Sequence, residues 1–264
     1  MIRDEIVSGL NTVWTAKNLV FYEETGSTNQ DAKKMAEEGA EHGTLVVANM
    51  QNAGRGRWGR TWLSPAGEAV YMSLLLRPPC EPEQASALTL VMALAVLETV
   101  KELKPQNCGI KWPNDIVMSG KKICGILTEM CVKKGDIDYV IIGVGINANQ
   151  SSFAEEIADT ATSILLQIGK RADRAWLICR IMHYFEQMYA EFEKTWDLTG
   201  LVERYHQSLL NKNRQVRVLD PKGEYEGVAL GINPQGELLV RKQDGELIEV
   251  YAGEVSVRGI YGYV

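Results

Sequence analysis

Apolar residues recur at helical spacing in four segments of this chain, and most of these segments also carry residues that commonly begin or end helices. They predict helices at residues 29–38, 82–104, 173–196 and 200–210. The second helix is apolar on most of its faces, so we expect it to be buried inside the fold. The third follows an N-cap residue, Asp173, and has a stripe typical of a core-facing helix, formed by Ile181, Phe185, Met188, Tyr189, Phe192 and Trp196.

Five runs rich in β-branched residues lie between these helices and predict strands. They cover residues 44–50, 69–76, 109–118, 122–130 and 139–147, and Gly, Pro or Asn bounds them. The helices and strands are mixed without strict βαβ alternation. The sequence therefore predicts an α/β or α+β domain with a mixed sheet.

The pattern changes after about Asn211, where short, partly alternating strands are separated by the turns PKG, NPQG and QDG. We expect a small all-β barrel of roughly 50 residues here, docked on the larger domain because so short a chain has little core of its own. The predicted domains are residues 1–211 and 212–264.

The composition is that of an average soluble globular protein, with 45% hydrophobic and 23% charged residues. A net charge of −6 argues against a general nucleic-acid binder. The five cysteines include no C-x-x-C pair and the three histidines are scattered, so we expect reduced thiols and no metal held by the protein. The N-terminus lacks a signal segment and no apolar run is long enough to span a membrane, so we expect a cytoplasmic protein.

One loop departs from this acidic character. The stretch QNAGRGRWGRTW at 51–62 alternates three arginines with three glycines, and the nearest acidic residues outside it are Glu41 and Glu68. Glycine lets backbone N–H groups approach a ligand closely, and arginine pairs with phosphate or carboxylate. A clamp for a phosphate or an adenylate therefore fits better than a solvated loop or an RNA-binding segment, and we expect the loop to become ordered when its anion binds.

A second motif, KWPND at 111–115, combines polar residues with a proline that interrupts a strand. Pro-Asn-Asp is common in turns, so a simple turn is one interpretation. The other places Asn114 and Asp115 at a strand end facing a ligand. Local sequence favours the two equally.

Two glycine-containing segments follow. GKKICGIL at 120–127 puts Lys121 and Lys122 at the entrance of an apolar strand. A lysine at such a position is usually solvated. If it points inward instead, its charge would help a carboxylate approach a phosphate. GVGINA at 143–148 matches a dinucleotide-binding pattern. A dinucleotide-binding fold also needs a second strand that ends in an acidic residue, and the sequence after this segment predicts no such strand. We therefore exclude an NAD site.

Taken in order, these motifs, together with GSTN at 26–29 and GEVS at 253–256, closely resemble the biotin–protein ligases over nearly the whole chain. The resemblance implies a catalytic domain like that of class II synthetases and lipoate ligases, followed by an SH3-like domain. It also implies an enzyme that joins biotin to ATP as biotinyl-5′-adenylate, with Mg²⁺ accompanying the ATP. The biotinyl group then passes to one lysine of a biotin carboxyl carrier protein.

The resemblance further implies which residues form the site. The positions that match biotin contacts are Ser27, Thr28, Asn29, Gln51, Arg55, Gly56, Arg57 and Lys122. Those that match ATP or adenylate contacts are Arg60, Trp62, Asn114 and Asn147, and those that match catalytic residues are Arg57, Lys122 and Asp115. Some members have arginine where this chain has Trp58, so no charge role is transferred to that position.

Two alternatives stay open, a lipoate–protein ligase with the same chemistry and a non-catalytic RNA-binding protein. Many bacterial relatives begin with a DNA-binding winged helix, but GSTN starts here at Gly26. We therefore expect no specific DNA binding and no membrane association. Related proteins often dimerise through the sheet of the catalytic domain, so a homodimer is a further expectation.

Overall fold

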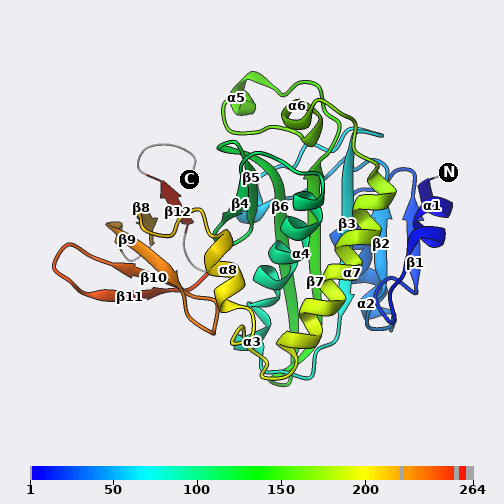
Figure 1. The fold of residues 1–264 in the computed structure, drawn as a ribbon. Coiled ribbons are helices and arrows are strands. Elements are labelled where there is room, and N and C mark those ends of the chain that lie inside the picture. The colour runs from blue at the N-terminus through cyan, green and yellow to red at the C-terminus, as the bar shows by residue number, and fades with distance from the viewer. Residues whose placement is uncertain (1, 221–222, 253–255, 260–264) are drawn as a thin grey trace.

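The large domain is built on a seven-stranded mixed sheet. The computed structural model describes residues 2–220, 223–252 and 256–259. Its large-sheet strands are β1 (Leu19–Tyr22), β2 (Leu45–Ala48), β3 (Ala69–Leu76), β4 (Cys108–Lys111), β5 (Asp115–Met118), β6 (Lys121–Lys133) and β7 (Asp136–Asn147). They run in the order β1-β2-β3-β7-β6-β5-β4 (Figure 1). β1 and β2 are parallel, and the other neighbouring pairs are antiparallel.

A separate antiparallel sheet follows later in the chain. Its strands are β8 (Arg214–Leu219), β9 (Tyr225–Ile232), β10 (Leu238–Arg241), β11 (Leu247–Val250) and β12 (Ser256–Gly259), in the order β11-β10-β9-β8-β12. The two sheets confirm the predicted α/β class with a small C-terminal β domain. Residues 253–255 of the GEVS motif lie outside the described residues.

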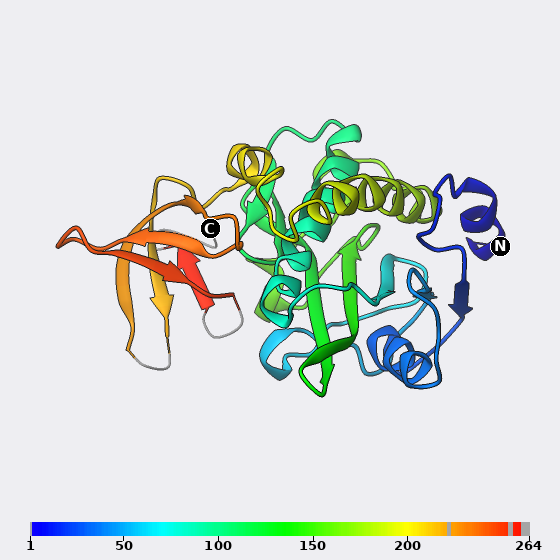
Figure 2. The same cartoon turned by 90° about the horizontal axis from the view of Figure 1, so that it is seen from below.

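Helices cover the two faces of the large sheet unequally. Helices α4 (Leu88–Glu102) and α7 (Arg174–Phe192) lie on one face, and α2 (Thr28–Glu37) lies on the other (Figure 2). Beneath α2, strand β7 contributes Tyr139 and Ile141 to a small apolar cluster. Because side chains alternate along a strand, the next residues on this face are Gly143, Gly145 and Asn147, beyond the cluster under α2. This end of the sheet is left open.

Most of the predicted helices are present. α7 and α8 (Val202–Ser208) lie within the predicted ranges, and α2 begins one residue before its predicted start. Asp173 Oδ1 accepts a hydrogen bond from Trp176 N as an N-cap does. The helix predicted at 82–104 is interrupted, giving α3 (Pro82–Ala85) and then α4. The interruption is a tighter turn, in which Ala87 N donates to Gln84 O three residues back. α4 is almost entirely buried, as predicted.

The strand predicted at 109–118 is wrong as a single element. It consists of β4 and β5, joined by a turn at Trp112–Asn114 that contains a cis Trp112–Pro113 peptide bond. Proline cannot continue the ladder, so the chain reverses there. The elements that the sequence pattern did not predict are α1 (Ile2–Gly9), β1, the short helices α5 (Glu155–Ala158) and α6 (Ile164–Ile168), and the 3₁₀ turn η1 (Arg57–Gly59).

The helical stretch Pro82–Glu102 has the length and hydropathy of a membrane-spanning helix, the one such stretch among the described residues. Its apolar window is 72% buried in the fold. The core helix of a globular domain has this property, because it is covered by protein on nearly all sides.

The C-terminal domain docks on the KWPND turn. Trp112 is 1% exposed, and its indole Nε1 donates to Gly236 O in the turn between β9 and β10. Its backbone N–H donates to Asn211 Oδ1, and Leu198 N donates to Pro234 O of the same β9–β10 turn. The turn that carries Asn114 and Asp115 is therefore held by both domains.

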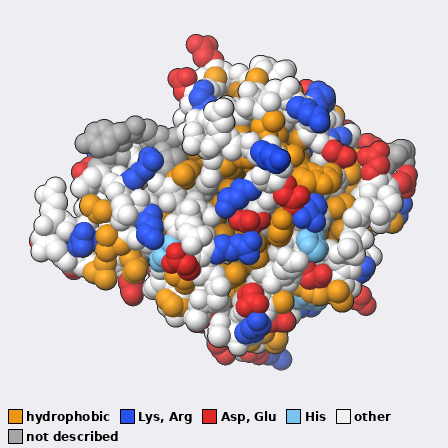
Figure 3. Space-filling view, viewed as in Figure 1, with side chains coloured by type: hydrophobic (Ala, Val, Ile, Leu, Met, Phe, Trp, Pro, Cys, Tyr) orange, Lys and Arg blue, Asp and Glu red, His pale blue; other side chains and the backbone are white. Residues whose placement is uncertain are grey.

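The outer surface of α4, α7 and α8 carries interleaved basic and acidic side chains (Figure 3). Arg180 pairs with Glu102, and both Lys101 and Arg204 pair with Glu98. Such exposed pairs contribute little to stability, but each one neutralises its own charge. Among the described residues of this face, positive charge is therefore interspersed with negative charge.

One carboxylate fastens the segment between α1 and β1 to α7. Glu186 Oε2 accepts from Val13 N at 2.7 Å, and Oε1 accepts from Trp14 N at 2.8 Å and from Thr15 N at 3.0 Å. Burial raises the pKa of this carboxyl, but the hydrogen bonds from the backbone outweigh burial and the pKa is lowered. The ionised form is thus the one that holds the segment.

We expect Glu186→Ala to lower the free energy of unfolding by about 2 kcal/mol at pH 7, since three backbone donors lose a charged acceptor. Because the pKa of Glu186 is lower in the folded state, its contribution is complete above the unfolded value of about 4.3 and is lost as the pH falls through the folded value. Urea unfolding at several pH values measures this. Glu193→Gln, an exposed change at the end of the same helix, is the control; an equal effect at pH 3.5 and pH 7 would contradict the prediction.

Candidate functional site

One cavity of about 1190 Å³ lies over the end of the sheet that α2 leaves open. β6 and β7 form its floor, and the glycine–arginine loop, the KWPND turn and the α5 segment form its walls. All of the predicted site residues line it: Ser27, Thr28, Asn29, Gln51, Arg55, Gly56, Arg57, Arg60, Trp62, Asn114, Asp115, Lys122 and Asn147. The fold thus brings together motifs that are far apart in the sequence.

Glycines on two adjacent strands keep the floor flat. A Cβ atom at Gly143 would lie 2.1 Å from Asn29 Oδ1, and one at Gly145 would lie 2.6 Å from the Trp62 ring. A Cβ at Gly125 would lie 3.1 Å from the same ring. A side chain at Gly143 or Gly145 would displace Asn29 or Trp62, so these glycines are required by close approach. Trp62 Nε1 is buried and has no hydrogen-bond partner among the described residues.

The polar residues at the start of α2 hold one another in place. Thr28 N and Oγ1 both donate to Gln51 Oε1, at 2.8 and 3.1 Å. Asn29 Oδ1 accepts from Ser73 Oγ at 2.6 Å, and its Nδ2 donates to Glu129 Oε2 at 2.6 Å. Ser27 occupies the N-cap position without a side-chain cap bond. This end of the cavity is therefore a rigid, satisfied network with few adaptable groups.

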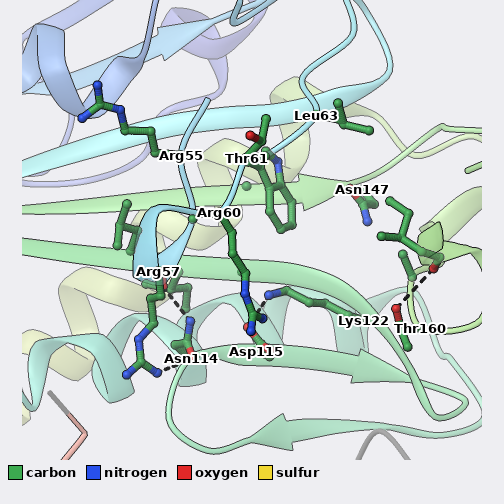
Figure 4. A pocket seen from close by; sticks show the side chains of 18 of the residues that line it. Arg55, Arg57, Arg60, Thr61, Leu63, Asn114, Asp115, Lys122, Asn147 and Thr160 are labelled. Atoms are coloured by element: carbon green, nitrogen blue, oxygen red, sulfur yellow. Dashed lines mark hydrogen bonds and ion pairs between the residues drawn. The ribbon is translucent and has the colours of Figure 1, made fainter. Parts of the chain in front are cut away.

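The middle of the cavity places one carboxylate among several cations. Lys122 Nζ lies 2.6 Å from Asp115 Oδ1, and Lys111 is the register partner of Asp115 across the β4–β5 turn. The side chain of Arg60 extends toward Asp115 and Lys122, whereas Arg55 points away from them (Figure 4). The cations outnumber the carboxylate, so this part of the cavity attracts anions.

Lys111 is a site residue that the sequence interpretation did not assign. It is 8% exposed and lines the cavity. Burial lowers its pKa to about 8, with Asp115 opposing this change and Lys122, Arg258 and Arg60 reinforcing it. Its position in the KWPND motif could have suggested a role in the site, but the sequence alone does not show that β4 directs this lysine toward the cavity. Arg258, from β12, lines the same cavity and was also missed.

Arg57 links the loop to both domains. Its guanidinium donates to Asn114 Oδ1 at 3.2 Å (Figure 4) and to Ala252 O, in the C-terminal domain, at 2.5 Å. Asn114 Nδ2 in turn donates to Ile126 O on β6. The adjacent Trp58 has φ 61° and is 59% exposed, so it does not anchor the loop by burial. Arg57 instead anchors the loop through its hydrogen bonds to Asn114 and Ala252.

The α5 segment closes the cavity beside β6. Lys122 N donates to Thr160 O, and Lys121 Nζ donates to Ala158 O. Lys121 therefore supports this wall while Lys122 faces the cavity. Asn147 Nδ2 donates to Thr162 O, so the end of β7 holds the same segment from the other side.

Donors for a resident metal ion are sparse. The described residues contain no group of three or more His, Cys, Asp or Glu side chains that could hold one. Asp115 is the carboxylate nearest Lys122, and it is paired with that lysine. A divalent cation would fit here only if it arrived already bound to phosphate oxygens, as Mg²⁺ does with ATP.

We expect the affinity of the cavity for ATP to fall about three- to tenfold between pH 7.5 and pH 9, because Lys111 loses its charge as the pH rises through its pKa of about 8. ATP keeps a constant charge over this range. Calorimetric titration measures the affinity. Lys111→Met should bind ATP more weakly at pH 7.5 and show no such dependence; a parallel fall in this variant would assign the effect to another group.

Comparison with known proteins gives independent information on the chain. The model of the biotin/lipoate A/B protein ligase family matches residues 21–147, and that of the biotin protein ligase C-terminal domain matches residues 213–258. The first range holds every predicted site residue, and the second holds most of the small sheet.

Individual relatives extend over almost the whole chain. The bifunctional ligase/repressor BirA of Bacillus subtilis is 38% identical over 96% of this chain and 78% of its own length. The biotin–[acetyl-CoA-carboxylase] ligase of Mycobacterium tuberculosis is 34% identical over 96% of this chain and 93% of its own. Among solved structures, the Aquifex aeolicus biotin protein ligase in complex with biotin and ATP superposes with a TM-score of 0.79, at 32% identity, over 92% of this chain and 99% of that one. The chain belongs to the biotin–protein ligase family.

Proposed function

We propose that this protein activates biotin with ATP, forming biotinyl-5′-adenylate and pyrophosphate, and transfers the biotinyl group to a lysine of a biotin carboxyl carrier protein. The observation that carries the proposal is that every predicted contact residue lines the same cavity as Lys122 and Asp115. The relatives named as biotin–[acetyl-CoA-carboxylase] ligases and the structure with biotin and ATP support the choice of substrates.

The first step joins two anions. A carboxylate oxygen of biotin attacks the α-phosphorus of ATP, and the bond to the β-phosphate oxygen breaks to release pyrophosphate. Repulsion between carboxylate and phosphate opposes this approach. Arg57, Arg60 and Lys122, which all line the cavity, offset the repulsion, and Mg²⁺ enters as part of the ATP substrate.

The ends of the cavity suit the two parts of the adenylate. The Thr28–Gln51 network and Ser27, Asn29, Arg55 and Gly56 form the end that we assign to biotin. Trp62, Arg60, Asn114 and Asn147 surround the part that we assign to the nucleotide. The Trp62 ring covers Gly125 and Gly145 in the ligand-free protein. A flat ligand group that binds on these strands must therefore displace the indole or lie beside it.

The second step needs a neutral amine. The ε-nitrogen of the acceptor lysine attacks the acyl carbon, the carbon–oxygen bond to the phosphate breaks, and AMP leaves with the electron pair. A free lysine has a pKa near 10.4, so a nearby base must accept its proton. Asp115, the carboxylate beside Lys122, fills this role, and the proton then passes to solvent. Homodimerisation and the absence of specific DNA binding stay predictions.

The decisive experiment incubates the protein with biotin, MgATP and an apo carrier domain, and weighs the carrier by mass spectrometry. We expect a gain of one biotinyl group that depends on ATP. Lys122→Ala should reduce the rate by at least about 100-fold, because it removes the charge beside the reacting carboxylate. Lys121→Ala is the matched control, since this neighbour bonds to Ala158 O instead. A gain with lipoate in place of biotin would assign the chain to lipoate ligation.

A second prediction concerns retention of the intermediate. Arg57→Gly removes the loop guanidinium that we assign to the adenylate phosphate, and we expect the adenylate to dissociate about tenfold faster or more. Pulse labelling with radioactive ATP followed by rapid gel filtration measures the retained adenylate. Pyrophosphate release, measured in parallel, separates formation from loss. Unchanged retention would show that the loop does not act as a lid.

A further inference from the structure

A second cavity of about 310 Å³ adjoins the first. The two share part of their walls, including Arg57, Pro113 and Asn114. Beyond this boundary, the second cavity is lined by residues from α3, α4, β6 and the C-terminal domain, among them Pro82, Ala85, Ser86, Thr89, Met130 and Tyr251. No step proposed above uses it.

The guanidinium of Arg57 lies at the boundary between the two cavities. Two oxygen atoms, Asn114 Oδ1 and Ala252 O, accept hydrogen bonds from the guanidinium of Arg57. Burial lowers the pKa of Arg57, and the charge of Asp115, the residue after Asn114, opposes this change. A positive group at this position therefore lies between the adenylate cavity and the second cavity.

We infer that Arg57 occupies, in the ligand-free protein, the position that the amino group of the acceptor lysine takes after adenylate formation, and that the second cavity is the passage by which this lysine enters. The inference rests on the proposed function and adds to it the route of the protein substrate.

The chemistry of the passage fits a lysine side chain. A lysine has four methylene groups followed by an ammonium, and the walls are apolar at Pro82, Ala85, Met130 and Tyr251. When Arg57 turns toward the phosphate of the adenylate, Asn114 Oδ1 and Ala252 O lose their donor. An unsatisfied acceptor at such a site costs free energy, and an incoming ammonium restores both bonds. One cation replaces another, so the charge at the boundary is conserved.

This exchange also sets the order of the reaction. Before the adenylate forms, Arg57 blocks the lysine. After it forms, the lysine lies beside Asp115, loses its proton to that carboxylate or to solvent through it, and attacks the acyl carbon while AMP leaves. The acceptor lysine can therefore reach the mixed anhydride only after Arg57 has moved to the phosphate of the adenylate.

The test narrows the passage without touching the adenylate cavity. Ser86→Phe places a ring in the second cavity from the α3–α4 connection, and Met130→Trp does so from β6; neither residue lines the first cavity. The control is Glu83→Phe, an exposed position on α3 that lines neither cavity. Biotin-dependent ATP–pyrophosphate exchange measures the first step. Transfer to the apo carrier domain, to Nα-acetyl-lysine amide and to hydroxylamine measures the second.

We expect at least one blocking variant to lower kcat/KM for the carrier and for the lysine amide by about tenfold or more, with pyrophosphate exchange and reaction with the smaller hydroxylamine within about twofold of wild type. Normal transfer by both variants, or slow transfer to the carrier with normal transfer to the lysine amide, would overturn the inference. If the wild-type protein shows no biotin-dependent exchange, the proposed function fails instead.

Discussion

The site depends on a stretch of sheet that carries no side chains. Gly125, Gly143 and Gly145 lie on two adjacent strands, and the first turn of α2 reaches only the edge of this stretch, where Asn29 meets Gly143. Asn29 and Trp62 pack directly on the backbone of these strands, at distances that a Cβ atom would not allow. A flat floor with side chains arriving only from the rim can hold an extended molecule against the sheet. The loops and charges around the floor can act on a ligand only because the three glycines leave room above the strands.

Electrostatics then decides which molecule the floor holds. The chain has a net charge of −6, and its outer helices pair their cations with surface acids, whereas the middle of the cavity gathers lysines and arginines around Asp115. Burying these cations has a cost, which is visible in the lowered pKa of Lys111. An anionic ligand offsets that cost, and so the cavity is suited to a phosphate-bearing molecule.

The small domain takes part in this arrangement through two contacts. Gly236 O receives the indole N–H of Trp112 and so positions the turn that carries Asn114 and Asp115. Ala252 O receives the guanidinium of Arg57 and so positions the loop opposite. Both walls of the cavity near Asp115 are thus fixed by one domain. This explains physically how a separate β sheet can influence a reaction on a floor to which it contributes no strand.

The sequence by itself determined two kinds of feature, the elements with strong periodicity, such as α7 with its cap at Asp173, and the motifs that line the cavity. Each of these depends on residues that are close together in the chain. The sequence could not decide between a turn and a ligand-facing strand end for KWPND, and the structure shows both, a turn whose Asn114 and Asp115 face the cavity. Only the tertiary structure assigned Lys111, separated Lys121 from Lys122, and placed Arg57 against Ala252. Those outcomes depend on which strand lies beside which, and the free energy of such contacts arises between residues far apart in the chain.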